Sequence, residues 1–373
     1  MSARLFEITA RSKMTFDFCK MADFTFGPGQ DVAAELAISS PDWTLYCLDF
    51  TEDKALFVEL PPGSNLDKPV FIHEMQFQEG RRAIAVPLDD LEALASKLPP
   101  LPKLAFLFNI GRCGSTLAGR ILAQLPGVWS LSEPDCYTNL AMARRTVPPE
   151  RAKALIAAST RLMCRPPLGV DVDTVVIKLR SEPIMIAELV VQALPEARYL
   201  FLYRDAEGYV NSLGKFVQRI MGEQYIVPES WRVVWHIISI NGPLSLLDHY
   251  FDKPASQLLP AEIHTMTWLI RMDGYLAALG HGVSFQALHY RDLNSDRRLS
   301  TARLLEGCGI STEYLDLALN GFDKDAHAGS TSDNTHQAKS LTDDDRMVIR
   351  AMLKRLGKPD YLALRVPSSL PPV

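Results

Sequence analysis

Short apolar segments alternate with helical patterns through most of the chain after residue 103. Each of these apolar segments is hydrophobic on both faces, and each is followed by a segment whose apolar residues recur at helical spacing. Strands of this kind are typical of a parallel sheet that helices cover on both sides, so we predict an α/β fold. The predicted strands are 104–109, 174–179, 198–204 and 283–288, and the helices that follow them are 115–125, 182–194, 206–220 and 300–309.

The first hundred residues carry a different pattern. Four short runs rich in β-forming residues are separated by turn residues, and several of them alternate in part between apolar and polar positions. This pattern predicts a small β-rich unit, closed by a short helix at 88–98. The four runs are 43–50, 54–61, 70–78 and 81–88.

The proline-rich joint "LPPLPK" at 98–103 marks a boundary between these two patterns. We therefore predict a β-rich N-terminal unit at 1–100 and an α/β core at 101–345. The remaining residues, 346–373, are predicted to form a C-terminal helix and a proline-rich tail.

The composition indicates which cellular compartment and which classes of binding partner are expected. A net charge of −5 argues against broad binding to nucleic acid or anionic membranes. The six cysteines are scattered without a C-x-x-C pair, which fits a reducing compartment. No apolar run is long enough to span a bilayer, and the start has no signal-peptide pattern. We therefore predict a cytoplasmic protein that binds neither nucleic acid nor membrane, and the oligomeric state is left open.

The segment "NIGRCGSTL" at 109–117 follows the first predicted strand of the core and opens its helix. Gly111 and Gly114 permit tight backbone angles and a close approach of main-chain N–H groups to an anion. Ser115 and Thr116 begin the helix, whose N-terminus favours negative charge. Such a motif in isolation is more often a simple turn and helix cap. Its position at the carboxyl end of a parallel strand favours an anion-binding loop.

The Walker pattern of ATP- and GTP-hydrolysing proteins does not fit this loop. That pattern reads G-x-x-x-x-G-K-[ST], whereas here the spacing differs and a glycine stands at the position of the lysine. Asp205, just after a predicted strand, is the best candidate for an Mg²⁺ ligand, but the position is not a clear match. We therefore expect no metal. A nucleotide kinase-like protein stays open as an alternative.

Segment 111–117 resembles the 5′-phosphosulfate-binding loop of sulfotransferases, which use 3′-phosphoadenosine 5′-phosphosulfate (PAPS). In bacterial and Golgi members this loop commonly reads R-S-G-T-T-L. The resemblance implies a P-loop-type parallel sheet flanked by helices, with PAPS as the cofactor and Arg112 at the basic position. The cofactor-binding residues that it implies in this loop are Gly111, Arg112, Cys113 (in place of serine), Gly114, Ser115, Thr116 and Leu117.

A second segment, 198–216, carries an independent resemblance to the same family. Arg204 ends a predicted strand, and Ser212 lies eight residues later in the helix that follows. Sulfotransferases hold the 3′-phosphate of the cofactor with an Arg and a Ser at this spacing. A planar guanidinium matches the geometry of phosphate, and the hydroxyl adds a further hydrogen bond. Ala206 replaces the family's usual proline.

Two weaker matches lie further along the chain. Tyr290 takes the position of the family tyrosine that approaches the adenine, although Arg291 replaces an acidic residue there. Ser330 and Thr331 either contact phosphate or belong to a solvated loop. The resemblance spans roughly residues 103–335. It does not include the N-terminal unit, which either shapes access of the acceptor or covers an edge of the sheet.

Sulfuryl transfer resembles phosphoryl transfer, a loose in-line displacement that depends on positioning and charge stabilisation. We expect Arg112 and Lys178 to stabilise the leaving phosphate, because cytosolic family members carry a lysine at the end of this strand. The alternative for Lys178 is an exposed side chain with no role. Arg180 stands where those enzymes have a histidine base, and it does not accept a proton near neutral pH.

The resemblance to protein-tyrosine sulfotransferases implies a different base, Glu133, in the segment after the loop helix. A base would work best with a raised pKa in a partly apolar setting. The alternative is that Glu133 is a structural carboxylate, and Asp135 and Glu182 are reserves. No histidine lies at a family base position.

Together these resemblances imply an enzyme that moves a sulfuryl group from PAPS to a hydroxyl or amine acceptor. The alternatives are a nucleotide-binding P-loop kinase-like protein and an inactive module that binds PAPS or another nucleotide, the latter because of Arg180. The acceptor is not indicated. Two aromatic helical segments either line an apolar pocket for it or pack in the core. They are 229–240, with Trp231 and Trp235, and 260–280, with Trp268.

Overall fold

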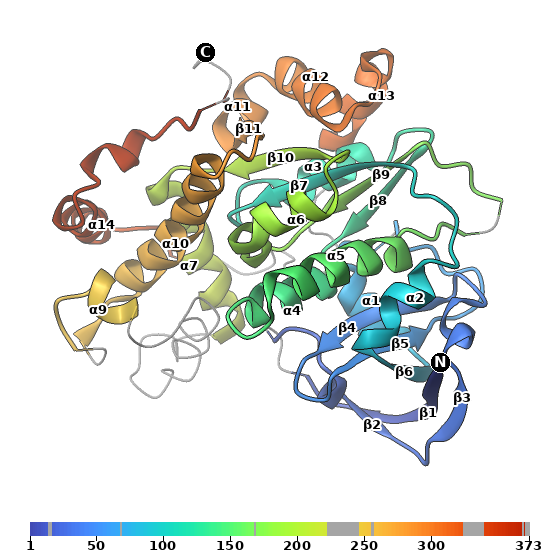
Figure 1. Ribbon diagram of the computed structural model, residues 1–373. Coiled ribbons are helices and arrows are strands. Elements are labelled where there is room, and N and C mark those ends of the chain that lie inside the picture. Colours follow the sequence, from blue (N-terminus) through green and yellow to red (C-terminus); the bar gives the residue numbers. More distant parts are fainter. Residues whose placement is uncertain are drawn as a thin grey trace.

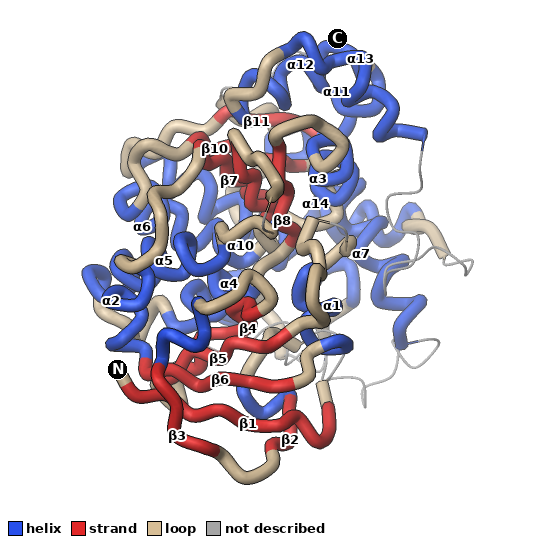
Figure 2. The backbone as a smooth tube through the Cα atoms, turned by 90° about the vertical axis from the view of Figure 1, so that its right-hand side faces the viewer, coloured by secondary structure: helices blue, strands red, loops and turns tan. Residues whose placement is uncertain are grey.

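The computed structural model contains two sheets joined by a layer of helices (Figure 1). One sheet is parallel and the other is antiparallel, as the two patterns of the sequence predict. Figure 2 shows them as separate groups of strands, the antiparallel sheet at the bottom of the view and the parallel sheet above it. The structure describes residues 1–13, 17–67, 69–167, 169–221, 246–254, 257–323, 339–367 and 369.

The parallel sheet has five strands in the order β11-β10-β7-β9-β8. Four of these strands were predicted from their apolar runs, and all four are confirmed. The edge strand β8 was missed because its sequence, "VWSLS", mixes serines with apolar residues. The strands are β7 (Lys103–Asn109), β8 (Val128–Ser132), β9 (Thr174–Lys178), β10 (Arg198–Tyr203) and β11 (Gln286–His289).

Helices cover both faces of this sheet, because right-handed crossovers that move in opposite directions place their helices on opposite faces. Helices α3 (Ser115–Leu122) and α12 (Arg297–Cys308) pack on one face. The 3-10 helix η4 (Glu182–Ile186) packs on β7 from the other face and contacts α4, α6 and α10. The bounds of those three helices are Asp135–Ala143, Ala187–Ala193 and Pro260–Gly280.

The antiparallel sheet has the order β2-β1-β6-β5-β4, with β3 paired to β1. The runs predicted at 43–50, 54–61 and 81–88 are confirmed as β4, β5 and β6. The predicted helix at 88–98 appears as η3 and α2. Strand β1 was missed because charged residues interrupt its few buried positions. The bounds are β1 (Ser2–Arg11), β2 (Phe24–Phe26), β3 (Gln30–Ala33), β4 (Trp43–Asp49), β5 (Lys54–Glu59), β6 (Arg82–Pro87), η3 (Leu88–Asp90) and α2 (Leu91–Ala95).

The β-rich run predicted at 70–78 is wrong, because this segment forms helix α1 (Ile72–Glu79). Ile72 and Gln76 are both fully buried and lie four residues apart, which is the spacing of a helix and not of a strand. The Gln76 amide donates to the Leu45 carbonyl at 2.9 Å, so a polar residue fills a buried helical position that the apolar pattern does not reveal.

The two sheets share one apolar core. Helices α4 and α5 (Pro149–Met163) lie between them (Figure 1). Helix α4 contacts β4 and η4, while α5 contacts α2 and α6. One continuous cluster of buried side chains includes Phe57 of the antiparallel sheet and Phe106 of the parallel sheet. The N-terminal unit therefore shares its core with the α/β part and is not a separately packed domain.

The remaining described helices pack mainly on other helices around the parallel sheet. The helix predicted at 260–280 is confirmed as α10, which contacts α7 and α14. Within the described ranges, no helix is both long and apolar enough to cross a bilayer. The segment 229–240 with Trp231 and Trp235 lies outside the described residues, as do Ser330 and Thr331. The other bounds are α7 (Ala206–Met221), α9 (Leu246–Tyr250), α11 (Tyr290–Ser295), α13 (Leu315–Leu319) and α14 (Asp343–Arg355).

Candidate anion-binding and catalytic site

The glycine loop lies at the carboxyl end of β7, the middle strand of the parallel sheet. Gly111 and Gly114 have φ values of 77° and 81°, in the left-handed region that glycine adopts without strain. Arg112 also lies there, at φ 53°, and for a residue with a Cβ this costs on the order of 1 kcal/mol or more. The loop therefore holds its arginine in a strained conformation, which is common at functional sites.

Asn109, which the sequence analysis did not single out, fixes the start of this loop. Its buried side-chain oxygen accepts from the Gly111 N–H at 2.8 Å, and its Nδ2 donates to the Leu179 carbonyl at 2.7 Å. One amide thus ties the ends of β7 and β9 to the glycine turn. An asparagine at the last position of a buried strand is the signal that points to such a role.

The other predicted loop residues divide into those that face the core and those that open helix α3. Cys113 is buried, and its thiol donates to the Leu202 carbonyl at 3.2 Å. Burial raises the pKa of Cys113 to about 11, so the thiol stays protonated near neutral pH. Leu117 packs against the core, while Ser115 and Thr116 form the first turn of the helix.

Arg112 reaches across to helix α7. Its Nε donates to the Ser212 hydroxyl at 3.2 Å, and its guanidinium lies 4.8 Å from the ring centre of Phe216. Burial lowers the pKa of Arg112, and the positive charges of Arg219 and Arg204 lower it further. Several cations are therefore gathered at this edge of the sheet.

Arg204 and Tyr290 directly follow β10 and β11 and lie beside the glycine loop. The Arg204 guanidinium lies 4.3 Å from the ring centre of Tyr290, and its Nη1 donates to the Arg112 carbonyl at 3.4 Å. Trp268 of α10 donates its Nε1–H to the Arg204 carbonyl at 2.9 Å. A Cβ on Gly114 would lie 2.9 Å from the Tyr290 ring, so only glycine fits under it. The structure thus brings together the glycine loop and the predicted residues from two other elements.

No described carboxylate forms a salt bridge with Arg112 or Arg204. The Nε of Arg204 is buried and has no hydrogen-bond partner among the described residues. Buried cations normally have a counter-ion, and a guanidinium fork matches the oxygens of phosphate or sulfate. These residues therefore fit an anionic ligand with phosphate or sulfate groups.

A second set of charges lies at the ends of β9 and β8. Lys178 is fully buried, so the alternative of an exposed side chain is wrong. Its Nζ lies 2.7 Å from Oε1 of Glu133 and 4.9 Å from the ring centre of Phe71. Its stem packs over α3, since a Cβ on Gly119 would be 3.5 Å from the Lys178 Cδ. The lysine thus lies beside the helix that the glycine loop opens.

Glu133 directly follows β8 and has the left-handed φ of 58°. Its backbone N–H donates to the Lys178 carbonyl at 2.7 Å, which continues the β8–β9 ladder by one residue. Its side chain is 19% exposed, and Oε2 lies 3.8 Å from the Arg180 Nε. Each carboxylate oxygen of Glu133 therefore faces a cation.

Arg180, at the position where cytosolic sulfotransferases have their base, binds carboxylates. Its Nε and Nη2 lie 2.6 and 3.0 Å from the two oxygens of Asp135. Burial alone would raise the pKa of Asp135, but Arg180, His73, Lys13 and the Cys19 N–H lower it to about 2. Burial would also lower the pKa of Arg180, yet Asp135 and Glu133 raise it above the usual value. This pair stays ionised.

The reserve carboxylate Glu182 is also engaged. It lies 2.6 Å from Arg271 of α10, and both side chains are buried. Burial would raise the pKa of Glu182, but Arg271 and Arg180 lower it. Neither reserve residue has a free carboxylate to offer an acceptor.

The N-terminal unit reaches this second set of charges, which the sequence analysis did not predict. Ser132 donates its hydroxyl to the Val70 carbonyl at 2.6 Å. Nδ1 of His73, on α1, lies 3.4 Å from the Glu133 carbonyl. Asp135 accepts from the Cys19 N–H at 2.9 Å. No local sequence signal would have found these contacts, because they join segments far apart in the chain.

The part of the chain that the structure describes contains no group of three or more His, Cys, Asp or Glu side chains arranged to hold a metal ion. Asp205, the nearest candidate for an Mg²⁺ ligand, accepts from the Gly208 N–H at 2.7 Å and so caps helix α7. The geometry gives this carboxylate a structural use.

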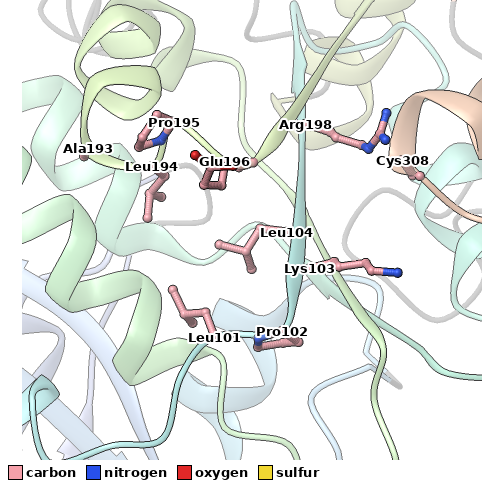
Figure 3. A pocket seen from close by; sticks show the side chains of 12 residues that line it. Leu101, Pro102, Lys103, Leu104, Ala193, Leu194, Pro195, Glu196, Arg198 and Cys308 are labelled. Carbon is pink, nitrogen blue, oxygen red and sulfur yellow. The ribbon is translucent and has the colours of Figure 1, made fainter.

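A separate hollow of about 610 Å³ lies at the opposite, amino-terminal edge of the parallel sheet (Figure 3). Leu101, Leu104 and Leu194 line it together with Pro102 and Pro195. Lys103 and Arg198, at the first positions of their strands, also line it. Ligands of open α/β sheets bind at the carboxyl edge, so this hollow is not the candidate site. Arg198, which lines this hollow, is exposed and lies at the opposite end of β10 from Arg204.

No family model matches this chain, and no curated protein matches it. A solved sulfotransferase from Alicyclobacillus acidocaldarius is 13% identical over 72% of this chain and 98% of its own, with a TM-score of 0.41. A sulfotransferase from Mycobacterium avium is 12% identical over 72% of this chain and 78% of its own, with a TM-score of 0.40. Likenesses this distant carry no argument about function.

Proposed function

We propose that the protein is a sulfotransferase that moves a sulfuryl group from PAPS to a hydroxyl or amine acceptor. The observation that carries this proposal is the pair Arg112 and Arg204: the Arg204 guanidinium donates to the Arg112 carbonyl of the glycine loop at 3.4 Å, and neither arginine forms a salt bridge with a described carboxylate. Arg204 and Ser212 would hold the 3′-phosphate, and the loop with Arg112 would hold the phosphosulfate. Tyr290 would lie against the adenine.

PAPS would supply the activated sulfuryl group, and the residues of this chain would position it and balance charge. In a loose in-line displacement the leaving 5′-phosphate gains negative charge, which Arg112 and Lys178 would stabilise. Glu133 belongs to the same catalytic set, either as the proton acceptor or as the partner that holds Lys178. Its contact with Lys178 at 2.7 Å supports the second role.

Two alternatives have specific support in the chain. A module that binds the nucleotide without catalysis is favoured by the ion pairs of Arg180 and Glu133, which occupy both positions that the family uses for a base. A kinase-like protein would need a metal ligand, and the hydrogen bond from Gly208 to Asp205 argues against it. That the protein acts in the cytoplasm, without nucleic acid or membrane partners, stays a prediction from its composition.

Ligand-dependent thermal unfolding tests the nucleotide. With 3′-phosphoadenosine 5′-phosphate at 100 times its dissociation constant, the protein should gain about 2.7 kcal/mol of stability, whereas ATP with Mg²⁺ should add much less. Arg204→Ala should weaken binding about 10- to 100-fold, because a charge-assisted contact is lost. Arg198→Ala, at the other end of the same strand, is the matched control and should bind normally.

Release of sulfate from PAPS, with water as the acceptor, tests the chemistry without knowledge of the natural substrate. The wild type should release sulfate faster than the uncatalysed solution, and Lys178→Met should abolish the difference. A bisphosphate shift without any sulfate release would favour the inactive module. Equal unfolding temperatures with and without the bisphosphate would sink the sulfotransferase proposal.

A further inference from the structure

The N-terminal unit brings a histidine to the site that the proposed function needs. His73 lies in the second position of α1, and its ring stacks on Phe71 at 5.6 Å between ring centres. Phe71 in turn contacts Lys178, and His73 itself contacts Glu133. The imidazole therefore belongs to the same cluster as the catalytic lysine and carboxylate.

The hydrogen bond of His73 determines its tautomer. Its Nδ1 lies 3.4 Å from the Glu133 carbonyl, and a carbonyl only accepts, so Nδ1 carries the hydrogen. In a neutral ring the lone pair is then on Nε2. This atom makes no hydrogen bond with a described residue and is not one of the fully buried unpaired atoms, so it keeps contact with solvent.

Burial and the neighbouring cations keep the ring neutral. The positive charges of Arg180 and Lys13 lower the pKa of His73. The negative charge of Asp135 and the hydrogen bond to the Glu133 carbonyl raise it. Burial, followed by the charge of Arg180, lowers the pKa of His73 well below 6.5. The ring is therefore a neutral hydrogen-bond acceptor over the whole range around pH 7.

Glu133 lacks this freedom. One of its carboxylate oxygens lies 2.7 Å from the Lys178 ammonium and the other 3.8 Å from the Arg180 Nε. Taking a proton from an acceptor would neutralise Glu133 and so weaken its ion pairs with Lys178 and Arg180. The imidazole beside it is neutral and so has no ion pair to weaken, and imidazole is the commonest general base in enzymes.

We propose that His73 is the group that takes the acceptor's proton, so that the N-terminal unit completes the active site of the α/β core. In this step the acceptor oxygen bonds to sulfur while the bond from sulfur to the leaving phosphate oxygen breaks. The hydroxyl proton passes to Nε2, and the resulting imidazolium later releases it to water. The proposal rests on the proposed function.

His73→Asn is the decisive variant, because its amide keeps a donor near the Nδ1 position and removes the titratable lone pair. Sulfate release from PAPS with water as the acceptor should fall about 100- to 10,000-fold. The decline of wild-type activity toward acid, which should follow the lowered pKa of His73, well below 6.5, should be absent from what remains. Binding of 3′-phosphoadenosine 5′-phosphate should not change, which separates this proposal from the nucleotide site.

Nitrogen NMR of the unliganded protein gives a readout that does not depend on turnover. One histidine should show the tautomer with hydrogen on Nδ1 and a pKa well below 6.5, and its signal should be missing in His73→Asn. His281→Asn is the control, since that ring is 61% exposed and pairs with Glu188 on the surface.

Two outcomes would overturn the proposal. Activity of His73→Asn with an unchanged acid limb, together with loss of that limb in Glu133→Gln, would make Glu133 the base. A wild-type ring with hydrogen on Nε2 would contradict the proposal even if the variant failed to fold. Absence of any bisphosphate shift in the wild type would instead mean that the proposed function itself is wrong.

Discussion

The carboxyl edge of the parallel sheet has two halves that treat their cations differently. At β7 and β10, Arg112 and Arg204 contact hydroxyl, carbonyl and aromatic groups but no described carboxylate. At β8 and β9, Lys178 and Arg180 are paired with Glu133 and Asp135. The difference separates two uses of positive charge, since one half is ready for an external anion and the other is balanced within the protein.

The two halves should therefore respond to mutation in opposite ways. Removing one member of a buried ion pair leaves an uncompensated charge and costs stability, typically 3–5 kcal/mol by general experience with such pairs, so roughly that range is expected here. Removing a cation that has no counter-ion relieves repulsion and costs mainly ligand affinity. Four measurements test this contrast.

The largest effect is expected for Asp135→Asn in the paired half. The amide preserves the shape of the side chain but leaves Arg180 with only the more distant Glu133, so the free energy of unfolding should fall by about 3–5 kcal/mol. Urea denaturation measures the change. Asp316→Asn removes the partner of Arg298 in an exposed pair, where 65% and 83% of the two side chains are accessible, and should change stability by less than about 1 kcal/mol.

A pH titration of stability sharpens the contrast through His289, which ends β11 beside the unpaired half. Burial, and then the charge of Arg365, lower the pKa of His289 to about 4. In the unfolded chain this imidazole binds a proton near pH 6.5, whereas in the folded protein it stays neutral down to about pH 4. Its contribution to the free energy of unfolding is therefore fully present above pH 6.5 and is lost as the pH falls toward 4. The loss should be about 3 kcal/mol.

His289→Asn isolates this contribution. The imidazole Nδ1 accepts from the Arg291 N–H at 3.1 Å as the cap of α11, and an asparagine oxygen replaces that acceptor without titrating. Thermal unfolding of the variant should depend less on pH between 6.5 and 4 than that of the wild type. Parallel curves for the two proteins would contradict the assignment.

Ser212→Ala tests the contact that links Arg112 to α7. The hydroxyl accepts from the Arg112 Nε at 3.2 Å, and in the proposed function it also binds phosphate. Affinity for 3′-phosphoadenosine 5′-phosphate should fall about fivefold, equivalent to about 1 kcal/mol, as for one neutral hydrogen bond. Isothermal titration measures this, and an unchanged affinity would remove Ser212 from the cofactor site.

The smallest effect on stability, and the one with the opposite sign, is expected for Arg112→Gly. Glycine adopts φ near 53° without strain, and two neighbouring cations lose a like charge, so the variant should be as stable as the wild type or up to about 1 kcal/mol more stable. Binding of the bisphosphate should weaken strongly. A destabilised variant would mean that Arg112 is a structural residue.

The unpaired half is also the half that the sequence predicts well. Its loop and helix are contiguous, and Arg204 and Ser212 lie within one strand–helix unit, so local periodicity places them all at one edge. The paired half depends on contacts between distant segments. The ion pair of Glu133 and Lys178 joins residues on two adjacent strands, and β8 lacks a strong apolar pattern.

The histidine of the paired half was beyond prediction for a further reason. His73 lies in a segment whose partial alternation indicates a strand, but which folds as a helix because Gln76 fills a buried position. In a strand, alternate residues of 70–78 would share one face, whereas in the helix residues three or four positions apart do. The contacts of the N-terminal unit with Glu133 and Asp135 therefore emerge only from the tertiary packing.

The shared core has a consequence for how the chain folds during synthesis. The antiparallel sheet is complete once residue 87 has emerged. The helices α4 and α5 that it packs against, and the partners of Cys19 and Val70 in the N-terminal unit, lie between residues 132 and 163. At about 5–20 residues per second, the ribosome would delay that packing by several seconds. During this interval the face of the sheet that later packs against α4 and α5 stays exposed to solvent.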